Sequence, residues 1–329
     1  MNSELVNGLF AGRPAAATAL AESRGATGGV SAGGKALDFG DPYDNLYAFG
    51  KIWGGYDEPV LSGFHGLMYA RIGAQRLIPL FGYTGTGCMQ SKIDADRNVW
   101  IRGKETGYFT DLATGDILET WKNPWTGKTV EVFNFYNAEM GGRLTAEMPR
   151  FAMGAVKDQA TLMNDGTQRV PSAAGTVPFI LPFEIYGDDL LLAWDYAHEY
   201  TNPVTPEGWP QASTGPRISP SEHFTFCMSL AEMQDRSVPS SRFMAGFSRL
   251  GQWWPWMRMG GHALAESGVV FGRMFSHKGL KGPADIPPKV LAYIEKHAPE
   301  YLTVPEHWPN VNPHGTWEAF AREVPKEIA

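Results

Sequence analysis

The sequence predicts a mainly β protein, built as an antiparallel β-barrel or as a strongly bent sheet with C-terminal helices. Gly and Pro together make up about 19% of the residues, against an average near 12%, so the chain is rich in turns. From Phe39 onward they recur about every ten residues between short runs that contain aromatic and β-branched residues. This spacing is typical of antiparallel strands joined by turns, and no regular repeat of roughly 20 to 50 residues accompanies it.

Residues 1–36 are predicted to form a flexible N-terminal arm, and residues 37–329 a single domain. The arm holds a short alanine-rich run over Ala15–Ala21, but it lacks the arginine pair of a twin-arginine export signal. No stretch of the chain reaches the roughly 18 to 20 apolar residues that span a bilayer. We therefore expect a soluble protein of the cytoplasm, or of the periplasm if an N-terminal signal has been removed.

The strands are predicted from short runs in which side chains alternate between two faces. Between them, the segment Thr201–Ser221 contains five prolines and is too long and irregular for a simple turn. It is a candidate lid or partner-contact loop. The strand candidates are Gly66–Ile72, Val99–Thr110, Thr129–Tyr136, Phe179–Ile185, Leu190–Tyr200 and His223–Leu230.

Two short helices are predicted near the C-terminus, where they form a helical brace over about residues 285–323. The first covers Lys289–His297, which follows two prolines and carries apolar residues on neighbouring turns. The second covers Thr316–Glu323, where Trp317 and Phe320 are three residues apart and share one face. Both helices can therefore dock an apolar face on the sheet.

Charge and motifs exclude several classes of partner. The net charge of -7 and the absence of any Lys/Arg run disfavour nucleic acid and anionic membranes. The glycine-rich segment Gly29–Ala36 ends in Ala36, where a phosphate-binding loop needs Ser or Thr. The eight His residues show no convincing metal-ligand spacing, so we expect no cofactor and no metal. Cys88 and Cys227 are expected to be buried free thiols.

A tryptophan-rich segment, Phe247–Gly260, carries three Trp, two Met and two Arg. Such residues can line an apolar cavity for an aromatic ligand, while an Arg holds an oxyanion, a carboxylate or a phenolate. They can also form a plug that closes one end of a barrel, with the Arg stems packed on the indoles. The two alternatives are compatible. The substrate-binding candidates in this segment are Trp253, Trp254, Trp256 and Met259, and the catalytic candidates are Arg249 and Arg258.

A second candidate site lies in the predicted strand Leu190–Tyr200. There Trp194, Tyr196 and His198 share one face, and Asp195 lies on the other. His titrates near neutral pH and Tyr can donate to a developing oxyanion, so this row suits acid–base chemistry on an aromatic substrate. The alternative is an amphipathic outer face of a strand. Trp194 is a substrate-binding candidate, and the other three are catalytic candidates.

The predicted strand Val99–Thr110 alternates between a polar set of side chains and a set that includes Glu105. The polar set contains Arg102 and Tyr108, which can face either solvent or a polar lumen. Both are therefore candidates for substrate binding.

Seven segments form a pattern over roughly residues 37–323: Leu37–Leu46, Thr110–Gly115, Trp121–Gly127, Trp254–Gly260, Pro287–Pro288, His297–Tyr301 and Asn312–Phe320. This pattern resembles the bacterial family known as domain of unknown function 1838. The resemblance implies no established catalytic residues. Many members of that family look exported through a twin-arginine signal, which this chain lacks. At the level of fold, a lipocalin-like antiparallel barrel agrees with the turn spacing.

The absence of nucleotide, flavin, haem and metal signatures leaves acid–base chemistry as the simplest activity. We expect a cofactor-independent lyase or isomerase that acts on a hydrophobic aromatic molecule, for example a lignin-derived biaryl. His198 or Asp195 would remove a hydroxyl proton, formaldehyde or water would leave, and Tyr196 with Arg249 or Arg258 would stabilise the phenolate-like intermediate. The alternative is a non-catalytic, lipocalin-like binding protein for aromatic, terpenoid or steroid ligands. A protein-interaction module and a homodimer are left open.

Overall fold

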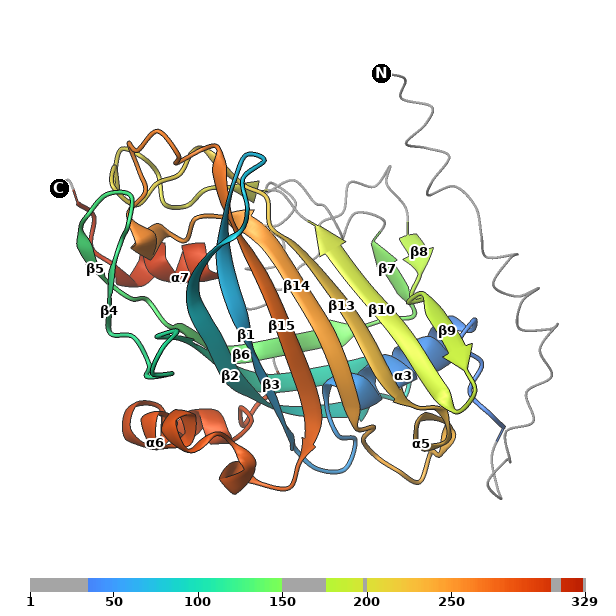
Figure 1. The fold of residues 1–329 in the computed structure, drawn as a ribbon. Coiled ribbons are helices and arrows are strands. Elements are labelled where there is room, and N and C mark those ends of the chain that lie inside the picture. Colours follow the sequence, from blue (N-terminus) through green and yellow to red (C-terminus); the bar gives the residue numbers. More distant parts are fainter. Residues whose placement is uncertain (1–34, 150–175, 198–199, 309–314, 328–329) are drawn as a thin grey trace, which may run out of the picture.

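A nine-stranded antiparallel sheet forms most of the computed structural model, which describes residues 35–149, 176–197, 200–308 and 315–327 (Figure 1). The central strand is β15 and β1 pairs with it, so the beginning and the end of the sheet-forming chain meet in the middle. In sheet order the strands are β6 (Phe135–Leu144), β3 (Val99–Thr110), β2 (Ile78–Ile93), β1 (Val60–Ile72), β15 (Gly268–Leu280), β14 (Phe243–Gln252), β13 (Ser221–Ser229), β10 (Asp189–Ala197) and β9 (Phe183–Tyr186).

The large sheet is open in the described part of the chain. Its edge strands β6 and β9 do not pair with each other there, so the predicted closed, lipocalin-like barrel is not confirmed. The mainly β class is confirmed. Three two-stranded sheets accompany the large sheet in the described part of the chain: β4 (Thr120–Lys122) with β5 (Thr129–Glu131), β7 (Glu147–Pro149) with β8 (Thr176–Pro178), and β11 (Tyr200–Thr201) with β12 (Arg217–Ile218).

The sheet curves strongly, and glycines on its concave face permit the curvature. A Cβ atom on Gly66 would lie 2.2 Å from the carbonyl oxygen of Arg273, and one on Gly85 would lie 2.0 Å from that of Thr106. Neighbouring backbone therefore occupies the space that any other side chain would need. Glycines at such positions are a common means of bending a sheet.

Helix α3 (Pro42–Trp53) lies inside this curve (Figure 1). Asp41 caps it by accepting hydrogen bonds from the backbone NH groups of Tyr43 and Asp44, and Pro42 suits the first turn because it has no NH to leave unpaired. The buried face of α3 packs against β3 on one side and against β10, β13 and β14 on the other. The sequence prediction did not include this helix, which fills one end of the concave side.

Two buried lysines hold the end of α3 in place. The Lys278 ammonium, on β15, donates to the carbonyls of Lys51 and Gly54 where α3 ends. The Lys51 ammonium donates in turn to three carbonyls around the end of α5 (Leu230–Gln234), including that of Asp235 at 2.8 Å. Each cation thus satisfies carbonyl groups that a helix end leaves without partners. Burial lowers the pKa of Lys51 to about 8.

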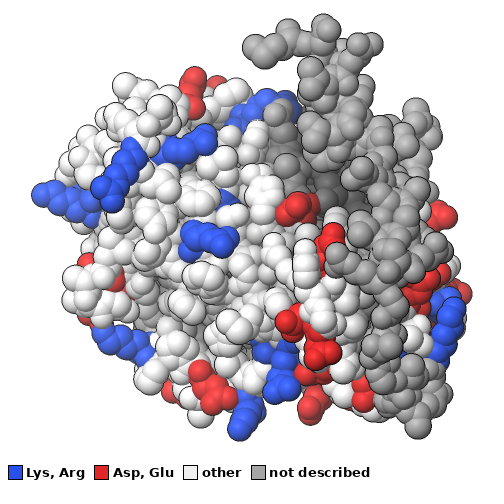
Figure 2. Space-filling view, turned by 45° about the vertical axis from the view of Figure 1, so that its right-hand side comes forward, with Lys and Arg blue, Asp and Glu red and all other residues white. Residues whose placement is uncertain are grey.

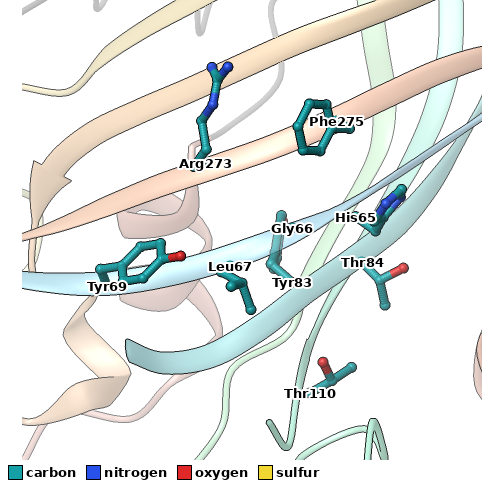
Figure 3. A pocket seen from close by; sticks show the side chains of 9 residues that line it. All are labelled: His65, Gly66, Leu67, Tyr69, Tyr83, Thr84, Thr110, Arg273 and Phe275. Atoms are coloured by element: carbon teal, nitrogen blue, oxygen red, sulfur yellow. The ribbon is translucent and has the colours of Figure 1, made fainter. Parts of the chain in front are cut away.

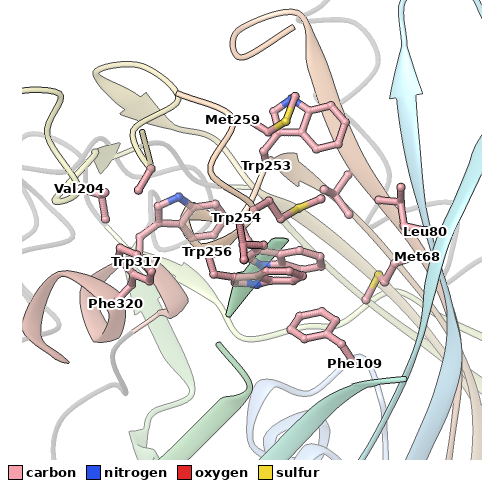
Figure 4. Close-up of a cluster of buried hydrophobic side chains, with 14 of the residues drawn as sticks. Met68, Leu80, Phe109, Val204, Trp253, Trp254, Trp256, Met259, Trp317 and Phe320 are labelled. Atoms are coloured by element: carbon pink, nitrogen blue, oxygen red, sulfur yellow. The ribbon is translucent and has the colours of Figure 1, made fainter. Parts of the chain in front are cut away.

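The other end of the concave side is filled by the tryptophan-rich segment, which includes the turn η1 (Pro255–Met257), and by α7 (Thr316–Glu323) (Figure 4). Trp254 and Trp256 stack at 6.4 Å between ring centroids, and Trp317 and Phe320 of α7 belong to the same core cluster. The segment thus fills one end of the concave side, but the barrel that it was expected to close is not found among the described residues.

On the outer face, α6 (Pro288–His297) covers part of β3. Its Val290 and Ile294 pack with Tyr108, and two short turns, η2 (Pro283–Asp285) and η3 (Pro299–Leu302), flank it. The helices predicted over Lys289–His297 and Thr316–Glu323 are thus found as α6, which begins one residue earlier, and α7.

Some predicted strands end where a polar or buried residue redirects the chain. The run Thr129–Tyr136 is divided between β5 and β6, and Asn134 between them accepts a hydrogen bond from the backbone NH of Phe109 at 3.2 Å. The segment Thr201–Ser221, expected to be a lid or contact loop, packs Val204 and Trp209 into the main core cluster.

Three further sequence predictions concern single residues and segments. Cys88 is a buried free thiol as expected, whereas Cys227 is exposed because it lies on the outer face of β13. The predicted N-terminal arm, residues 1–36, falls almost entirely outside the described residues. Among the described residues, no helix is long and apolar enough to cross a membrane.

Basic and acidic side chains are dispersed over the face shown in Figure 2, with broad uncharged areas between them.

Candidate functional site

Four polar side chains meet on the concave face of the sheet, on strands that lie on both sides of its centre. They are Tyr83 of β2, Glu105 of β3, Glu222 of β13 and Arg249 of β14, and we call them the concave-face cluster. Glu105 shares its face of β3 with Ile101, which packs against the α3 cluster. The negative charges of Glu105 and Glu222 both raise the pKa of Tyr83, so curvature of the sheet brings these groups within electrostatic reach.

Glu105 is the unusual member of the concave-face cluster. It lies opposite Gly87 on β2 and Asn137 on β6. Among the described residues, none donates a hydrogen bond to its carboxyl group or forms an ion pair with it. Burial, together with the negative charge of Glu222, raises the pKa of Glu105 to about 8. The carboxyl group is therefore mostly protonated at neutral pH and close to the pKa that suits proton transfer.

Arg249 and Glu222 are directly opposite in the register of β13 and β14. The Arg249 Nε atom is 3.4 Å from Oε1 of Glu222, and the Arg249 guanidinium carbon is 5.6 Å from the ring centroid of Trp254. The two side chains are 22% and 13% exposed, so water has limited access to the pair. The guanidinium is thereby held in one orientation between a carboxylate and an indole.

Tyr83 contributes a phenol to the concave-face cluster. A Cβ atom on Gly107 would lie 2.0 Å from its hydroxyl oxygen, so Gly107 makes room for the tip of the ring. Within the described chain the Tyr83 hydroxyl makes no hydrogen bond. Burial, and then the charge of Glu105, raises the pKa of Tyr83, which keeps the phenol protonated and able to donate.

Aromatic rings flank the concave-face cluster on two sides. Phe224 stacks on Phe247, with 4.3 Å between ring centroids, and on Trp194 at 5.5 Å. On the other side Tyr83 contacts Phe64 at 5.4 Å. Flat apolar surfaces of this kind suit a planar, apolar ligand.

The centre of the concave face is less buried than its two ends. Tyr83, Glu105 and Phe247 are half-buried, whereas Trp256 at one end and Leu46 at the other are at most 1% exposed. Solvent therefore reaches the polar cluster although both ends of the concave side are filled.

Several residues singled out in the sequence lie at or near the concave-face cluster. Arg249 is a member of it, Trp254 packs on Arg249, and Trp194 belongs to one of the flanking aromatic surfaces. Trp253 and Trp256 are buried in the neighbouring core, where the Trp253 indole NH donates to the carbonyl of Leu264 at 2.8 Å.

Arg258 and Met259 make contacts that stabilise the fold around that same core. Arg258 forms an ion pair with Glu327 and lies 5.3 Å from the ring centroid of Phe320. The Met259 sulfur accepts a hydrogen bond from the Asn123 amide at 3.1 Å.

Asp195 lies elsewhere, on the outer face of β10. There it is 57% exposed and bonds to Nδ1 of His223 at 3.2 Å. The alternation along β10 sets Asp195 on the face opposite to Trp194. Tyr196 is paired with Glu222 in the strand register, but its side chain and the whole of His198 lie outside what the structure describes.

Arg102 and Tyr108 also lie on the outer face, because the polar set of β3 points away from the concave side. Arg102 donates to Oε1 of Gln90 at 2.7 Å and to the carbonyls of Pro305 and Glu306. Tyr108 is buried beneath α6. Both hold the C-terminal segment against the sheet.

On the outer face, Asp195, His223 and Ser248 form a row across three neighbouring strands. The order matches that of a catalytic triad. Among the hydrogen bonds of the described residues, none joins Ser248 to His223, and the row is on an exposed sheet surface. It therefore lacks the nucleophile–base contact that a triad requires. The described chain also holds no group of three or more His, Cys, Asp or Glu side chains able to bind a metal ion.

Sequence reasoning missed Tyr83, Glu105 and Glu222 as site residues. For Glu105 a signal was present, since Gly103 and Gly107 flank it on the same face of the strand. A charged residue between two glycines on an otherwise apolar face indicates an uncrowded carboxyl group directed toward the protein interior. Nothing in the local sequence distinguishes Tyr83 from a core tyrosine.

The comparisons with known proteins identify a family and no activity. No curated protein matches the chain. A family model described as "protein of unknown function (DUF1838)" matches residues 57–324, which include the whole concave-face cluster and most of the domain. The chain therefore belongs to the DUF1838 family of proteins of unknown function.

Proposed function

We propose that this protein is a cofactor-independent lyase or isomerase that holds a hydrophobic aromatic molecule against the concave face and uses Glu105 for proton transfer. The observation that supports this most directly is the state of the Glu105 carboxyl group. It is half-buried, has no hydrogen-bond partner in the described chain, and has a pKa raised to about 8. A structural carboxylate would normally be paired, so a free one at an accessible interior position favours chemistry.

The proposal moves the base from His198 or Asp195 to Glu105. Asp195 lies on the outer face, away from the concave-face cluster, and His198 lies outside the described residues. Arg249 and Tyr83 take the role of stabilising an oxyanion, because Tyr83 lies within electrostatic reach of both Glu105 and Arg249, and both side chains can donate hydrogen bonds.

The reaction in its lyase form is an elimination with release of formaldehyde. Glu105, as the carboxylate, takes the proton from the hydroxyl of a hydroxymethyl group. The C–O bond becomes a C=O bond, the C–C bond breaks, and its electron pair forms an alkene while an aryl ether oxygen leaves as a phenolate. Arg249 stabilises that phenolate, which then takes the proton back from Glu105. The products are formaldehyde, an alkene and a phenol.

The test is to incubate the full chain with phenolic dimers that carry a hydroxymethyl group, such as lignin-derived biaryls, and to measure formaldehyde. Glu105→Gln removes the base and keeps the shape, and Glu295→Gln on the exposed side of α6 is the matched control. We expect the wild type and the control to release formaldehyde, and Glu105→Gln to release it at least about 100-fold more slowly. The rate of the wild type should rise toward pH 8. Unchanged release by Glu105→Gln would refute the role of Glu105.

The second candidate is a non-catalytic, lipocalin-like binding protein for aromatic, terpenoid or steroid ligands. The stacked rings of Trp194, Phe224 and Phe247 favour it, because they bind a planar ligand without any chemistry. The same compounds decide between the two candidates. Tight binding measured by tryptophan fluorescence, with no turnover of any compound, would support the carrier and contradict the lyase.

A further inference from the structure

A second possible ligand site lies on the outer face of the sheet, on the side opposite to the concave-face cluster. A pocket of about 390 Å3 is formed there by β1, β2, β15 and the end of β3. Figure 3 shows Leu67 and Tyr69 extending from β1 on one side, and Arg273 and Phe275 from β15 on the other. Its volume is in the range of small-molecule sites, and we call it the outer pocket.

The outer pocket has an apolar part that remains open to solvent. Leu67 is 40% exposed and Phe275 is 53% exposed, although both lie on central strands of the sheet. A ligand that covers this surface removes apolar area from water, which favours binding. The wall is therefore suited to an aromatic ring or a short aliphatic chain.

Next to this wall is Arg273, whose guanidinium has no acidic partner among the residues that the structure describes. Its guanidinium carbon lies 5.7 Å from the ring centroid of Phe275. Its Nη2 atom lies 3.5 Å from where a Cβ atom would stand on Gly246, so the glycine of the next strand leaves the cation uncovered. The nearest carboxylate along the outer row, Asp195, is bonded to His223.

We propose that the outer pocket binds a small carboxylate with an apolar body. The body lies against Leu67 and Phe275, and the carboxylate accepts hydrogen bonds from the Arg273 guanidinium at the edge of the pocket. A single guanidinium matches the two oxygens of one carboxylate. Because Arg273 lies beside an apolar wall, the pocket favours a ligand that has both a carboxylate and an apolar body. Tyr83 of the concave-face cluster also borders the pocket, but Leu67, Arg273 and Phe275, which carry the proposal, lie on the opposite face of the sheet. The proposal therefore does not rest on the proposed activity.

The experiment is isothermal titration calorimetry of the full chain with 3-phenylpropionate and with its uncharged counterpart 3-phenylpropan-1-ol. Arg273→Gln removes the cation, and Arg322→Gln on the exposed side of α7 is a control with the same change in charge. Phe275→Ser removes the apolar wall. Glu105→Gln reports on binding at the concave face. All four side chains are at least partly exposed, and circular dichroism verifies that each variant is folded.

We expect the wild type to bind the carboxylate more tightly than the alcohol. Arg273→Gln should weaken carboxylate binding by about three- to tenfold and leave the alcohol unchanged, because one partly exposed charged hydrogen bond is lost. Phe275→Ser should weaken the binding of both ligands. Arg322→Gln and Glu105→Gln should leave the binding of both ligands unchanged. Equal carboxylate affinity in Arg273→Gln and wild type would overturn the proposal. So would loss of binding in Glu105→Gln or Arg322→Gln, or no binding by the wild type at millimolar ligand.

Discussion

Glu105 on β3 and Glu222 on β13 interact across the concave side of the sheet, although four strands separate β3 from β13 in the sheet order. Only a strongly curved sheet brings two such strands within electrostatic reach. Glu222 is balanced by Arg249 at 3.4 Å, while Glu105 has no partner in the described chain and carries the raised pKa. The curvature thus places a carboxyl group that forms an ion pair and a carboxyl group with a raised pKa on the same face of the sheet.

The first prediction concerns pH and stability. Because the pKa of Glu105 is about 8 in the folded protein, above the ordinary value of 4.5, the folded state holds a proton that the unfolded state has released between these values. The free energy of unfolding should therefore fall as pH rises from about 4.5 to 8, with a slope of at most about 1.4 kcal/mol per pH unit from this group. Urea unfolding of the wild type and of Glu105→Gln at several pH values measures this pH dependence of the free energy of unfolding. Parallel curves for the two proteins would contradict the assignment.

The second prediction concerns the glycines of the concave face. Gly66→Ala and Gly85→Ala place a methyl group about 2 Å from backbone oxygens, which cannot move without distorting the neighbouring strand. Each should lower the free energy of unfolding by about 3 kcal/mol or prevent folding. Gly251→Ala is the matched control, because its nearest contact, Cβ of Pro220 at 3.6 Å, is of ordinary length. If all three variants are equally stable, the glycines do not determine the curvature.

The third prediction concerns the attachment of α3. The Asn45 side chain is fully buried and donates to the carbonyls of Phe39 and Leu181 at 2.9 and 3.2 Å, while its oxygen accepts from the backbone NH of Leu181 at 3.0 Å. Asn45→Ala leaves these groups buried without partners and should destabilise by about 2 to 4 kcal/mol. Arg322→Ala removes only an exposed pair with Glu323, and we expect a change below about 0.5 kcal/mol. Thermal unfolding of the two variants compares them directly.

The fourth prediction concerns the two thiols. Cys227 is exposed, whereas Cys88 is 3% exposed and burial raises its pKa to about 11. A thiol reagent at pH 8 should label one equivalent in the folded protein and two after unfolding. Cys227→Ser should abolish labelling of the folded state. Labelling of Cys88 at the same rate as Cys227 would show that its strand opens readily.

The sequence predicts β3 well because Val99–Thr110 alternates strictly between two faces and is bounded by turns. It also predicts α6 and α7, whose apolar residues recur at helical spacing. It left two alternatives for the sheet, a barrel or a strongly bent sheet, and in the described part of the chain the sheet does not close. The pairing of β1 with β15 and the edges at β6 and β9 depend on contacts between residues far apart, which local patterns do not encode.

For the candidate site, the difficulty was to decide which face of a strand points inward. The polarity of Arg102 and Tyr108 predicts that their side of β3 is the functional one, but α6 and the segment around Pro305 cover that side. Glu105 is on the other face, among apolar neighbours. Arg249 and Trp254 were identified from composition alone, since Arg and Trp are concentrated in one segment, and the structure brings them within 5.6 Å.

The central position of β1 and β15 has a consequence for how the chain is made. The hydrogen bond from Ser276 to the carbonyl of Gly63 joins residues 213 positions apart. During synthesis β1 can pair with β2 as soon as both have left the ribosome, but its other edge stays unpaired until β15 emerges. An unpaired edge is a template for association with other chains. The nascent protein is therefore most vulnerable to aggregation at the strand that later becomes the middle of its sheet.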